Sequence, residues 1–331
     1  VHSFAFLLEL VSELLCATGL PLWVWPLAGA LAAGGVLYRI CPDSAGEGIP
    51  SFIQGIENHK GALPVSVTFF KYGAALVTLA TFGCGGIVGP LGRVTAGIVS
   101  FTVGRVRILK LILTQDALRI ASVCGLAASL GAIFHVSIGG GILAVEIIHR
   151  ANMRYKDLFP GIMASCAAVF ICKAIGWDSF YTFQVPDEFM ECSKVGWLFL
   201  CAILSGLVGG GYEKLYLLTS RLFKRAAGMT MVKLIVGSMI AFFIAYLVNP
   251  GILGTSREFI PALVTGRFQI FSVFGNREVP LFSVLVVIML CKLLCNCIVV
   301  GSGMSAGFTG PAVIAGMLLG AAFALCVGIE P

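Results

Sequence analysis

The feature that most constrains this chain is the recurrence of long apolar runs. A helix needs about 20 consecutive, mainly apolar residues to cross the hydrocarbon core of a bilayer. Such runs recur along the 331 residues, at 22–39, 66–83, 117–134, 158–175, 195–213, 231–248, 281–300 and 309–328. We therefore expect an all-α fold, a polytopic membrane protein. A β-barrel would show alternating segments of about ten residues, whereas these runs are continuous.

Composition supports this interpretation and excludes a soluble domain. Apolar residues make up 58% of the chain and charged residues 11%, with a mean hydropathy of +0.99. Ordinary soluble domains contain roughly 25% charged residues. The formal net charge of +6 does not indicate nucleic acid, because the basic residues lie in segments between the apolar runs. We expect membrane lipids around the chain and no nucleic-acid partner.

The charges between the runs predict the orientation. Basic residues concentrate at 149–156 and 214–233, whereas 178–194 contains four acidic residues and one lysine. Cytoplasmic loops of membrane proteins carry an excess of Lys and Arg. We therefore expect the first two segments on the cytoplasmic side and the third outside, in a multi-pass protein of the cell membrane, that is, a plasma or inner membrane.

The twelve cysteines predict neither a disulfide framework nor a metal centre. Most lie inside apolar runs, where a thiol behaves as a small hydrophobic group. Cys291, Cys295 and Cys297 are neighbours in sequence, but no His or carboxylate lies near them and the spacing of tetrahedral metal sites is absent. We expect no metal ion and no other cofactor.

The two halves of the chain contain the same frame. Lys71 is followed by 14 residues and then by Gly86-Ile87-Val88-Gly89-Pro90, and Lys292 by 14 residues and then by Gly307-Phe308-Thr309-Gly310-Pro311. Transporter folds are often built from such repeats, with the site where their broken helices meet. We divide the single transmembrane domain into a first repeat, 1–175, and a second, 176–331.

Glycine and proline interrupt the apolar runs at these places and at 46–50. Irregular backbone at membrane depth persists only inside protein or beside a polar cavity, and proline is favoured just inside a helix start. We expect helix N-termini within the membrane at about 49, 89 and 310. Close packing of helices is the alternative interpretation of these glycines. As a repeated set, they favour a site where converging N–H groups bind a small anion weakly.

The three helix starts resemble the signatures of the CLC family of chloride channels and chloride/proton antiporters. Gly46-Glu47-Gly48-Ile49-Pro50, Gly86-Ile87-Val88-Gly89-Pro90 and Gly307-Phe308-Thr309-Gly310-Pro311 look like G-S-G-I-P, G-R-E-G-P and G-x-F-x-P, in that order. The segment 123–146 resembles the family stretch A-P-L-G-G-V-L-F-A-L-E. The resemblance implies a homodimer with one chloride pathway per subunit. It also implies that the family's first helix and last several helices lie outside this chain.

The resemblance further implies which residues bind the anion. The set gathers backbone N–H groups and one side chain at the three helix starts. It consists of Glu47, Gly48, Ile49, Ile87, Val88, Gly89, Phe308, Thr309 and Gly310. We expect no enzyme, since the chain has only four histidines and no His-Glu-x-x-His motif.

Three positions depart from the family pattern. The gating glutamate falls on Val88, the proton-relay glutamate of antiporters falls on Ile147, and Thr309 stands at the signature Phe. Neither Val88 nor Ile147 can carry a proton, so coupled antiport loses its chemical basis. We therefore expect a passive anion channel. A chloride/proton antiporter that uses other carboxylates, Glu47 and Glu146, and a non-conducting relative stay open as alternatives.

Glu47 replaces the family's serine and has two interpretations. Its carboxylate could compete with the anion at a helix N-terminus, or it could cap its own helix. We expect His135 to be a packed or interface residue and Glu146 to be held by a structural hydrogen bond. Lys71 and Lys292 are expected to snorkel or to pair, with an electrostatic role near the pathway as the alternative.

Overall fold

The chain folds into helices that follow the apolar runs. The computed structural model describes residues 1–105, 115–149, 155–181, 195–225, 230–274 and 279–328. Within these there is no strand, and Gly86 and Gly307 form an isolated bridge. The α-helices in chain order are α1 (His2–Ala17), α2 (Val24–Ala32), α3 (Tyr38–Ile40), α4 (Ile49–His59), α5 (Val65–Ala80), α6 (Val88–Arg105), α8 (Gln115–Phe134), α9 (Ser137–His149), α10 (Tyr155–Ala174), α11 (Val195–Arg225), α12 (Thr230–Val248), α13 (Phe259–Val264), α14 (Leu281–Ser302) and α15 (Thr309–Val327).

The prediction of a polytopic helical membrane protein is confirmed. Every predicted run is helical, although the first is divided into α2, a π-helical turn (Ala33–Leu37) and α3. Six helices, namely α8, α10, α11, α12, α14 and α15, are long and apolar enough to cross a membrane. Large apolar side chains are exposed on them, such as Phe199 and Leu207 on α11, at 71% and 69%. Such surfaces are rare on soluble monomers and suit contact with lipid.

One predicted boundary is wrong. We expected a span at 195–213 followed by a basic segment, but α11 continues to Arg225. The extension keeps Leu at helical spacing among good helix formers, and Lys224 and Arg225 in its last turn suit the negative end of the helix dipole. Most of 149–156 and 178–194, on which the predicted orientation depends, lies outside the described residues.

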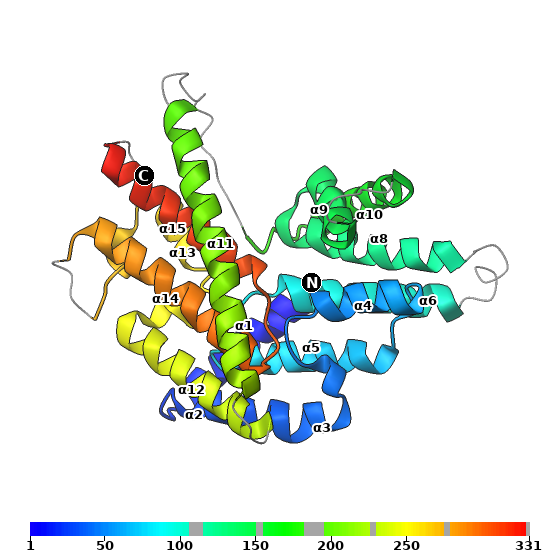
Figure 1. The fold of residues 1–331 in the computed structure, drawn as a ribbon, viewed down its shortest axis with the longest axis horizontal. Coiled ribbons are helices and arrows are strands. Elements are labelled where there is room, and N and C mark those ends of the chain that lie inside the picture. The colour runs from blue at the N-terminus through cyan, green and yellow to red at the C-terminus, as the bar shows by residue number, and fades with distance from the viewer. Residues whose placement is uncertain (106–114, 150–154, 182–194, 226–229, 275–278, 329–331) are drawn as a thin grey trace.

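The helices form two groups that meet at the loops before α6 and α15 (Figure 1). In one group α8 packs against α6, α9 and α10, and in the other α14 packs against α11, α12 and α15. Both central helices are apolar around most of their circumference, as buried helices are. The boundary between the predicted repeats stays a prediction, but the contacts of the loops, described below, are those of a duplicated fold.

The three predicted helix starts are confirmed to within one residue, at Ile49, Val88 and Thr309. Local sequence explains the first of them. Gly48 has φ +116°, a conformation that L side chains rarely adopt, and Pro50 occupies the first turn of α4, where no N–H is needed.

Candidate functional site

The starts of α6 and α15 lie against each other at the two repeated glycines. Gly86 N–H donates to the Gly307 carbonyl at 2.9 Å, and Gly307 N–H donates to the Gly86 carbonyl at 2.7 Å. The Asn296 amide fixes the pair by donating to the carbonyls of Cys84 and Gly307, at 3.1 and 3.2 Å. An antiparallel pairing of equivalent residues is what a local two-fold axis between inverted repeats produces.

The start of α4 lies against both members of this pair, that is, against α6 and against the loop before α15. Gly46 N–H donates to the carbonyl of Gly303, in the loop that precedes α15, at 3.1 Å. At Gly48, a Cβ atom would lie 2.9 Å from the Gly89 carbonyl oxygen of α6, so only glycine permits this approach. The structure thus brings all three predicted helix starts together.

The first N–H groups of α6 and α15 have no acceptor. The first intrahelical bonds run from Leu91 to Ile87 and from Ala312 to Phe308, each at 3.0 Å. The N–H groups that precede these donors are free in any α-helix. Among the described residues no hydrogen bond is made by the N–H groups of Val88, Gly89, Thr309 and Gly310. With the positive ends of two helix dipoles, they can accept a small anion without a full positive charge.

Glu47 lies between the starts of α4 and α6. Its Oε2 atom accepts a hydrogen bond from Ile49 N–H at 2.9 Å, and a Cβ atom at Gly89 would overlap its Oε1 atom. Both interpretations of this carboxylate therefore fit the geometry, because it caps its own helix and also stands at the N-terminus of the next. Lys71 is the cation that interacts with it electrostatically.

The two repeated lysines anchor loops, and the expectation that they snorkel is wrong. Both side chains are completely buried. Lys71 Nζ donates to the three carbonyl groups of 44–46, two of them at 3.1 and 3.2 Å. Lys292 Nζ donates to the carbonyls of Ile252 and Gly254, both at 2.8 Å. Lys71 thus holds the loop before α4, and Lys292 holds the loop before α13, since buried carbonyls need donors.

Sequence reasoning missed Tyr181 entirely. Its side chain is 1% exposed, its hydroxyl has no partner among the described residues, and a Cβ atom at Gly310 would overlap that hydroxyl. The ring stacks on Phe134 with 5.4 Å between the ring centroids. A buried hydroxyl without a partner is costly, so this one is suited to donate to an anion at the start of α15. No local pattern marks it, since the two segments are far apart in sequence.

The other predicted residues occupy two kinds of surroundings. Ile87 and Val88 are buried in the core, whereas Phe308 and Thr309 are half-buried. The ring of Phe308 packs edge-on against Tyr212 and Tyr216 of α11, at centroid distances of 5.8 and 4.6 Å. Val88 and Phe308 thus present an apolar and an aromatic side chain at these two helix starts, and Glu47 is the carboxylate that lies beside Gly89.

The segment of α9 that resembles the family's proton path contains no buried carboxylate. Ile147 is half-buried and packs against the hydrophobic core. Glu146 is exposed, and no hydrogen bond of its side chain appears among the described residues, contrary to our expectation of a structural bond. An exposed carboxylate at this position needs no partner when water or a headgroup region is available.

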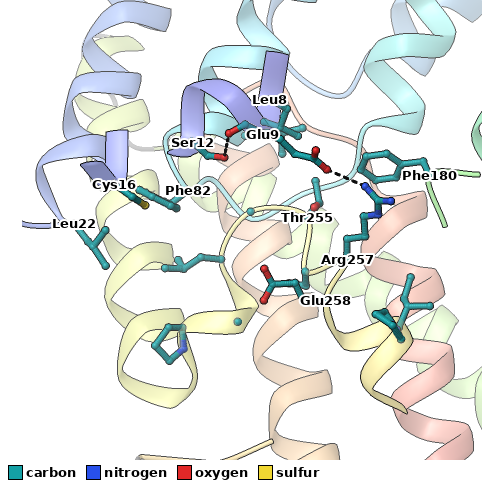
Figure 2. A pocket seen from close by; sticks show the side chains of 18 residues that line it. Leu8, Glu9, Ser12, Cys16, Leu22, Phe82, Phe180, Thr255, Arg257 and Glu258 are labelled. Carbon is teal, nitrogen blue, oxygen red and sulfur yellow. Dashed lines mark hydrogen bonds and ion pairs between the residues drawn. The ribbon is translucent and has the colours of Figure 1, made fainter. Parts of the chain in front are cut away.

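A cavity of about 670 Å³ lies away from the predicted residues (Figure 2). Leu8, Glu9 and Ser12 of α1 line one side, and the loop of Thr255 and Arg257 lines the other. Arg257 is the cation here, but its NH1 atom pairs with Glu9 at 3.0 Å and its guanidinium lies 4.9 Å from the Phe180 ring centroid. Since its charge is already matched, the cavity is a weaker anion site than the helix starts.

Comparison with known proteins identifies the class. A sequence model of the family described as "Voltage gated chloride channel" matches residues 29–330. The chain is 27% identical over 317 residues to the H(+)/Cl(-) exchange transporter ClcA of Vibrio vulnificus, which covers 92% of this chain and 63% of that protein. The chain therefore belongs to the voltage gated chloride channel family, the CLC family, and is a multi-pass membrane protein. It spans about three-fifths of the length of the curated relatives it matches, 60% and 63% for two of them.

Solved structures show the same fold. A CLC-type fluoride/proton antiporter superposes with a TM-score of 0.79 at 19% identity, covering 99% of this chain and 78% of that one. A slow cyanobacterial Cl-/H+ antiporter superposes with a TM-score of 0.71 at 22% identity, covering 99% and 76%. These relatives are membrane transport proteins and not enzymes. At these identities the likeness concerns the fold alone.

Proposed function

We propose that this chain forms the pathway of a passive channel for chloride-type anions. The observation that carries the proposal is the junction of α6 and α15, where free N–H groups from two long helices face one place and no carboxylate stands at Val88. Backbone N–H groups attract an anion through partial charges, so they release it more readily than a lysine or arginine would. Chloride is the substrate in this account, and no cofactor takes part.

Two side chains around the junction have opposite effects on an anion. Tyr181 adds a neutral donor at the start of α15, while Glu47 places a negative charge at the starts of α4 and α6. A carboxylate held at a helix N-terminus occupies the same favourable potential that an anion needs. We propose that Glu47 competes with the permeating anion and limits conduction.

Passive flux, rather than exchange, follows from the residues at the two family positions. A proton-coupled cycle needs a group that takes up and releases a proton, and Val88 and Ile147 have none. The second candidate function is a chloride/proton antiporter with Glu47 as proton carrier. It is favoured by the place of that carboxylate at the junction and by the names of the relatives.

The partner in this proposal is a second copy of the chain, with one pathway in each subunit. Exposed apolar side chains on α9 and α10 suit such a contact as well as they suit lipid: Ile138, Phe159 and Met163 are 60%, 70% and 55% exposed. Cross-linking in liposomes at low protein density distinguishes a subunit contact from a lipid contact, because only a dimer gives a discrete doubled mass.

The test is anion flux from liposomes that contain the purified full-length protein, with valinomycin clamping the potential and external pH recorded. We expect chloride efflux with no proton movement against a gradient. Chloride-driven proton uptake would support the antiporter, and absence of flux relative to protein-free liposomes would support a non-conducting relative.

A further inference from the structure

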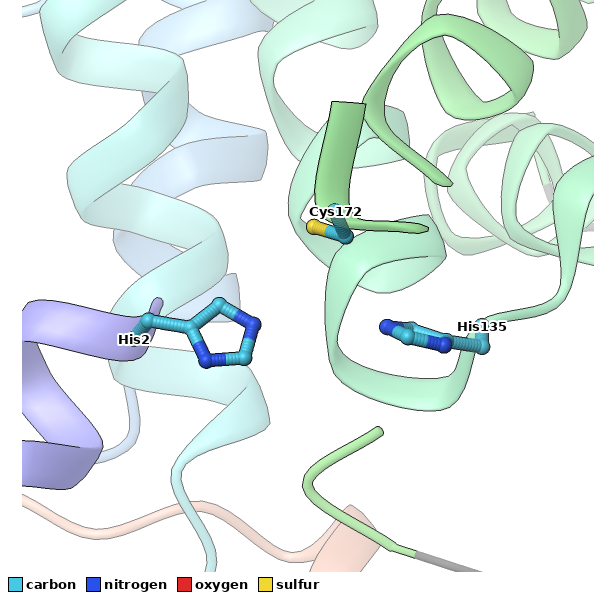
Figure 3. Close-up of side chains that lie close together, drawn as sticks. All are labelled: His2, His135 and Cys172. Carbon is cyan, nitrogen blue, oxygen red and sulfur yellow. The ribbon is translucent and has the colours of Figure 1, made fainter. Parts of the chain in front are cut away.

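Two histidines and a cysteine from separate segments meet away from the junction (Figure 3). His2 begins α1, His135 lies in the turn between α8 and α9, and Cys172 lies in the last turn of α10. One nitrogen of each imidazole and the Cys172 Sγ atom all lie within 4.8 Å of one another. In Figure 3 the His2 and His135 side chains point toward each other, and the Cys172 thiol lies near the space between them.

The donor atoms of this cluster are buried and unused. The Nε2 atoms of His2 and His135 are inaccessible to solvent and have no hydrogen-bond partner among the described residues. Cys172 is 5% exposed and is a free thiol. A buried polar nitrogen without a partner costs about 1–3 kcal/mol, and two at one place require an explanation.

Both rings are positioned by their surroundings rather than by each other. The His135 backbone has φ +54°, a left-handed conformation that is uncommon outside glycine. The residue after it is held in place, because the Val136 carbonyl accepts from Ser165 Oγ at 3.2 Å and from Gly140 N–H at 3.0 Å. The His2 ring stacks on Trp177 with 4.2 Å between the centroids. Donors fixed in this way need little ordering when they bind a ligand.

Two imidazole nitrogens and a thiolate are the donor set of zinc and related metals. Calcium and magnesium take oxygen ligands instead, and soft sulfur together with imidazole favours Zn²⁺. With Zn–N near 2.0–2.1 Å and Zn–S near 2.3 Å, tetrahedral donors stand about 3.3–3.6 Å apart. The cluster, with its donor atoms within 4.8 Å of one another, must contract by about 1 Å to reach that geometry.

Charged groups of both signs surround the cluster. His2 interacts electrostatically with the α-amino group of Val1 and with Arg257, which are positive, and with Asp178, which is negative. Asp178 is exposed and lies in the segment after α10, so its carboxylate or a water molecule can supply the fourth ligand.

We propose that His2, His135 and Cys172 form a binding site for a divalent metal ion of the zinc class. The bound ion links α1, the α8–α9 turn and the end of α10. His135 directly follows Phe134, the residue that stacks on Tyr181, so the ion also stiffens the support of the proposed anion ligand. The site itself is independent of whether the protein conducts anions.

The test is a titration of the full-length protein, reduced and in detergent, with Co²⁺, which reports thiolate ligation by a charge-transfer band. We expect a band that saturates at one Co²⁺ per chain and is displaced by Zn²⁺. Cys172→Ser removes the band. The matched control Cys166→Ser, on the same helix and half-buried, keeps it. His135→Ala keeps the thiol but weakens binding by at least about tenfold.

A thermal measurement makes the result independent of the spectrum. Zn²⁺ raises the unfolding temperature of the wild type and of Cys166→Ser, since it binds the folded state, and leaves that of Cys172→Ser unchanged. The proposal is overturned if the wild type gives no thiolate band, if the band persists in Cys172→Ser, or if His135→Ala binds Co²⁺ as tightly as the wild type.

Discussion

The two halves of the molecule begin their helices at the junction in the same way but surround them differently. In the first half, α4 has 11 residues and its start is capped by the side chain of Glu47. In the second half, α13 has 6 residues, and Glu258 before it makes no side-chain capping bond. The start of α6 therefore faces a carboxylate, whereas the start of α15 faces the neutral hydroxyl of Tyr181.

This difference distinguishes the features of the duplicated scaffold from the features of the anion pathway. The lysines, the paired glycines and the Gly-x-x-Gly-Pro starts occur in both halves and fix the loops. Glu258 stands three residues before Pro261 as Glu47 stands before Pro50, but it makes no cap. The cap of Glu47 and the Tyr181 hydroxyl beside Gly310 thus have no counterpart among the contacts of the described residues in the other half. We infer that the shared features maintain the fold and that the unmatched features set the anion affinity.

The largest expected effect is on the free energy of unfolding, when a buried lysine is removed. Lys71→Met leaves three carbonyl groups without their donor and Lys292→Met leaves two. Each unsatisfied buried acceptor costs about 1–3 kcal/mol. We expect the free energy of unfolding to fall by at least about 3 kcal/mol for the first variant and about 2 kcal/mol for the second, as measured by denaturation in detergent.

The matched control is Lys214→Met, because Lys214 is exposed on α11. Its effect should be within about 0.5 kcal/mol. If Lys71→Met and Lys292→Met are no less stable than this control, the lysines do not anchor the loops and the equivalence of the two halves loses its structural basis.

The next effect concerns the unmatched carboxylate. Glu47→Gln keeps the shape of the side chain and removes its negative charge from the starts of α4 and α6. A carboxylate at a helix N-terminus is held by up to about 2 kcal/mol, so we expect chloride efflux from liposomes to rise by up to about thirtyfold.

The control for that experiment is Glu57→Gln, on the exposed face of the same helix. It should leave efflux unchanged. Equal efflux in Glu47→Gln, Glu57→Gln and the wild type would mean that Glu47 only caps α4 and does not compete with the anion.

The smallest effect concerns the neutral donor in the other half. Tyr181→Phe removes the hydroxyl near Gly310 and keeps the stacking on Phe134. A hydrogen bond to a charged group contributes about 1.5–3 kcal/mol, so chloride binding, measured by calorimetry, should weaken by at least about tenfold. Tyr246→Phe, on the exposed face of α12, is the control. Unchanged affinity in Tyr181→Phe would remove this residue from the pathway.

Much of the fold could be predicted because its signals are local. Apolar runs of bilayer length mark the spanning helices, and Gly and Pro mark the broken starts at Ile49, Val88 and Thr309. The length of α11 is not predicted by its apolar run, because the basic residues after 213 occupy an extension of the helix rather than a loop.

The parts of the site that sequence reasoning missed depend on contacts between distant segments. Nothing near Tyr181 in the sequence indicates that its hydroxyl meets Gly310, and His2, His135 and Cys172 come from three segments far apart in the sequence. The same holds for Glu47, since its cap on α4 is local and could be foreseen, whereas its position against Gly89 is tertiary.

The most direct test of the central claim, passive anion conduction without proton exchange, is the reversal potential of the full-length protein in a planar bilayer. A fixed chloride gradient is applied, with and without a pH gradient across the membrane. Our account predicts reversal at the chloride equilibrium potential, unchanged by the pH gradient, because Val88 and Ile147 cannot carry protons. A reversal potential that moves with the pH gradient would contradict it and assign proton exchange to Glu47.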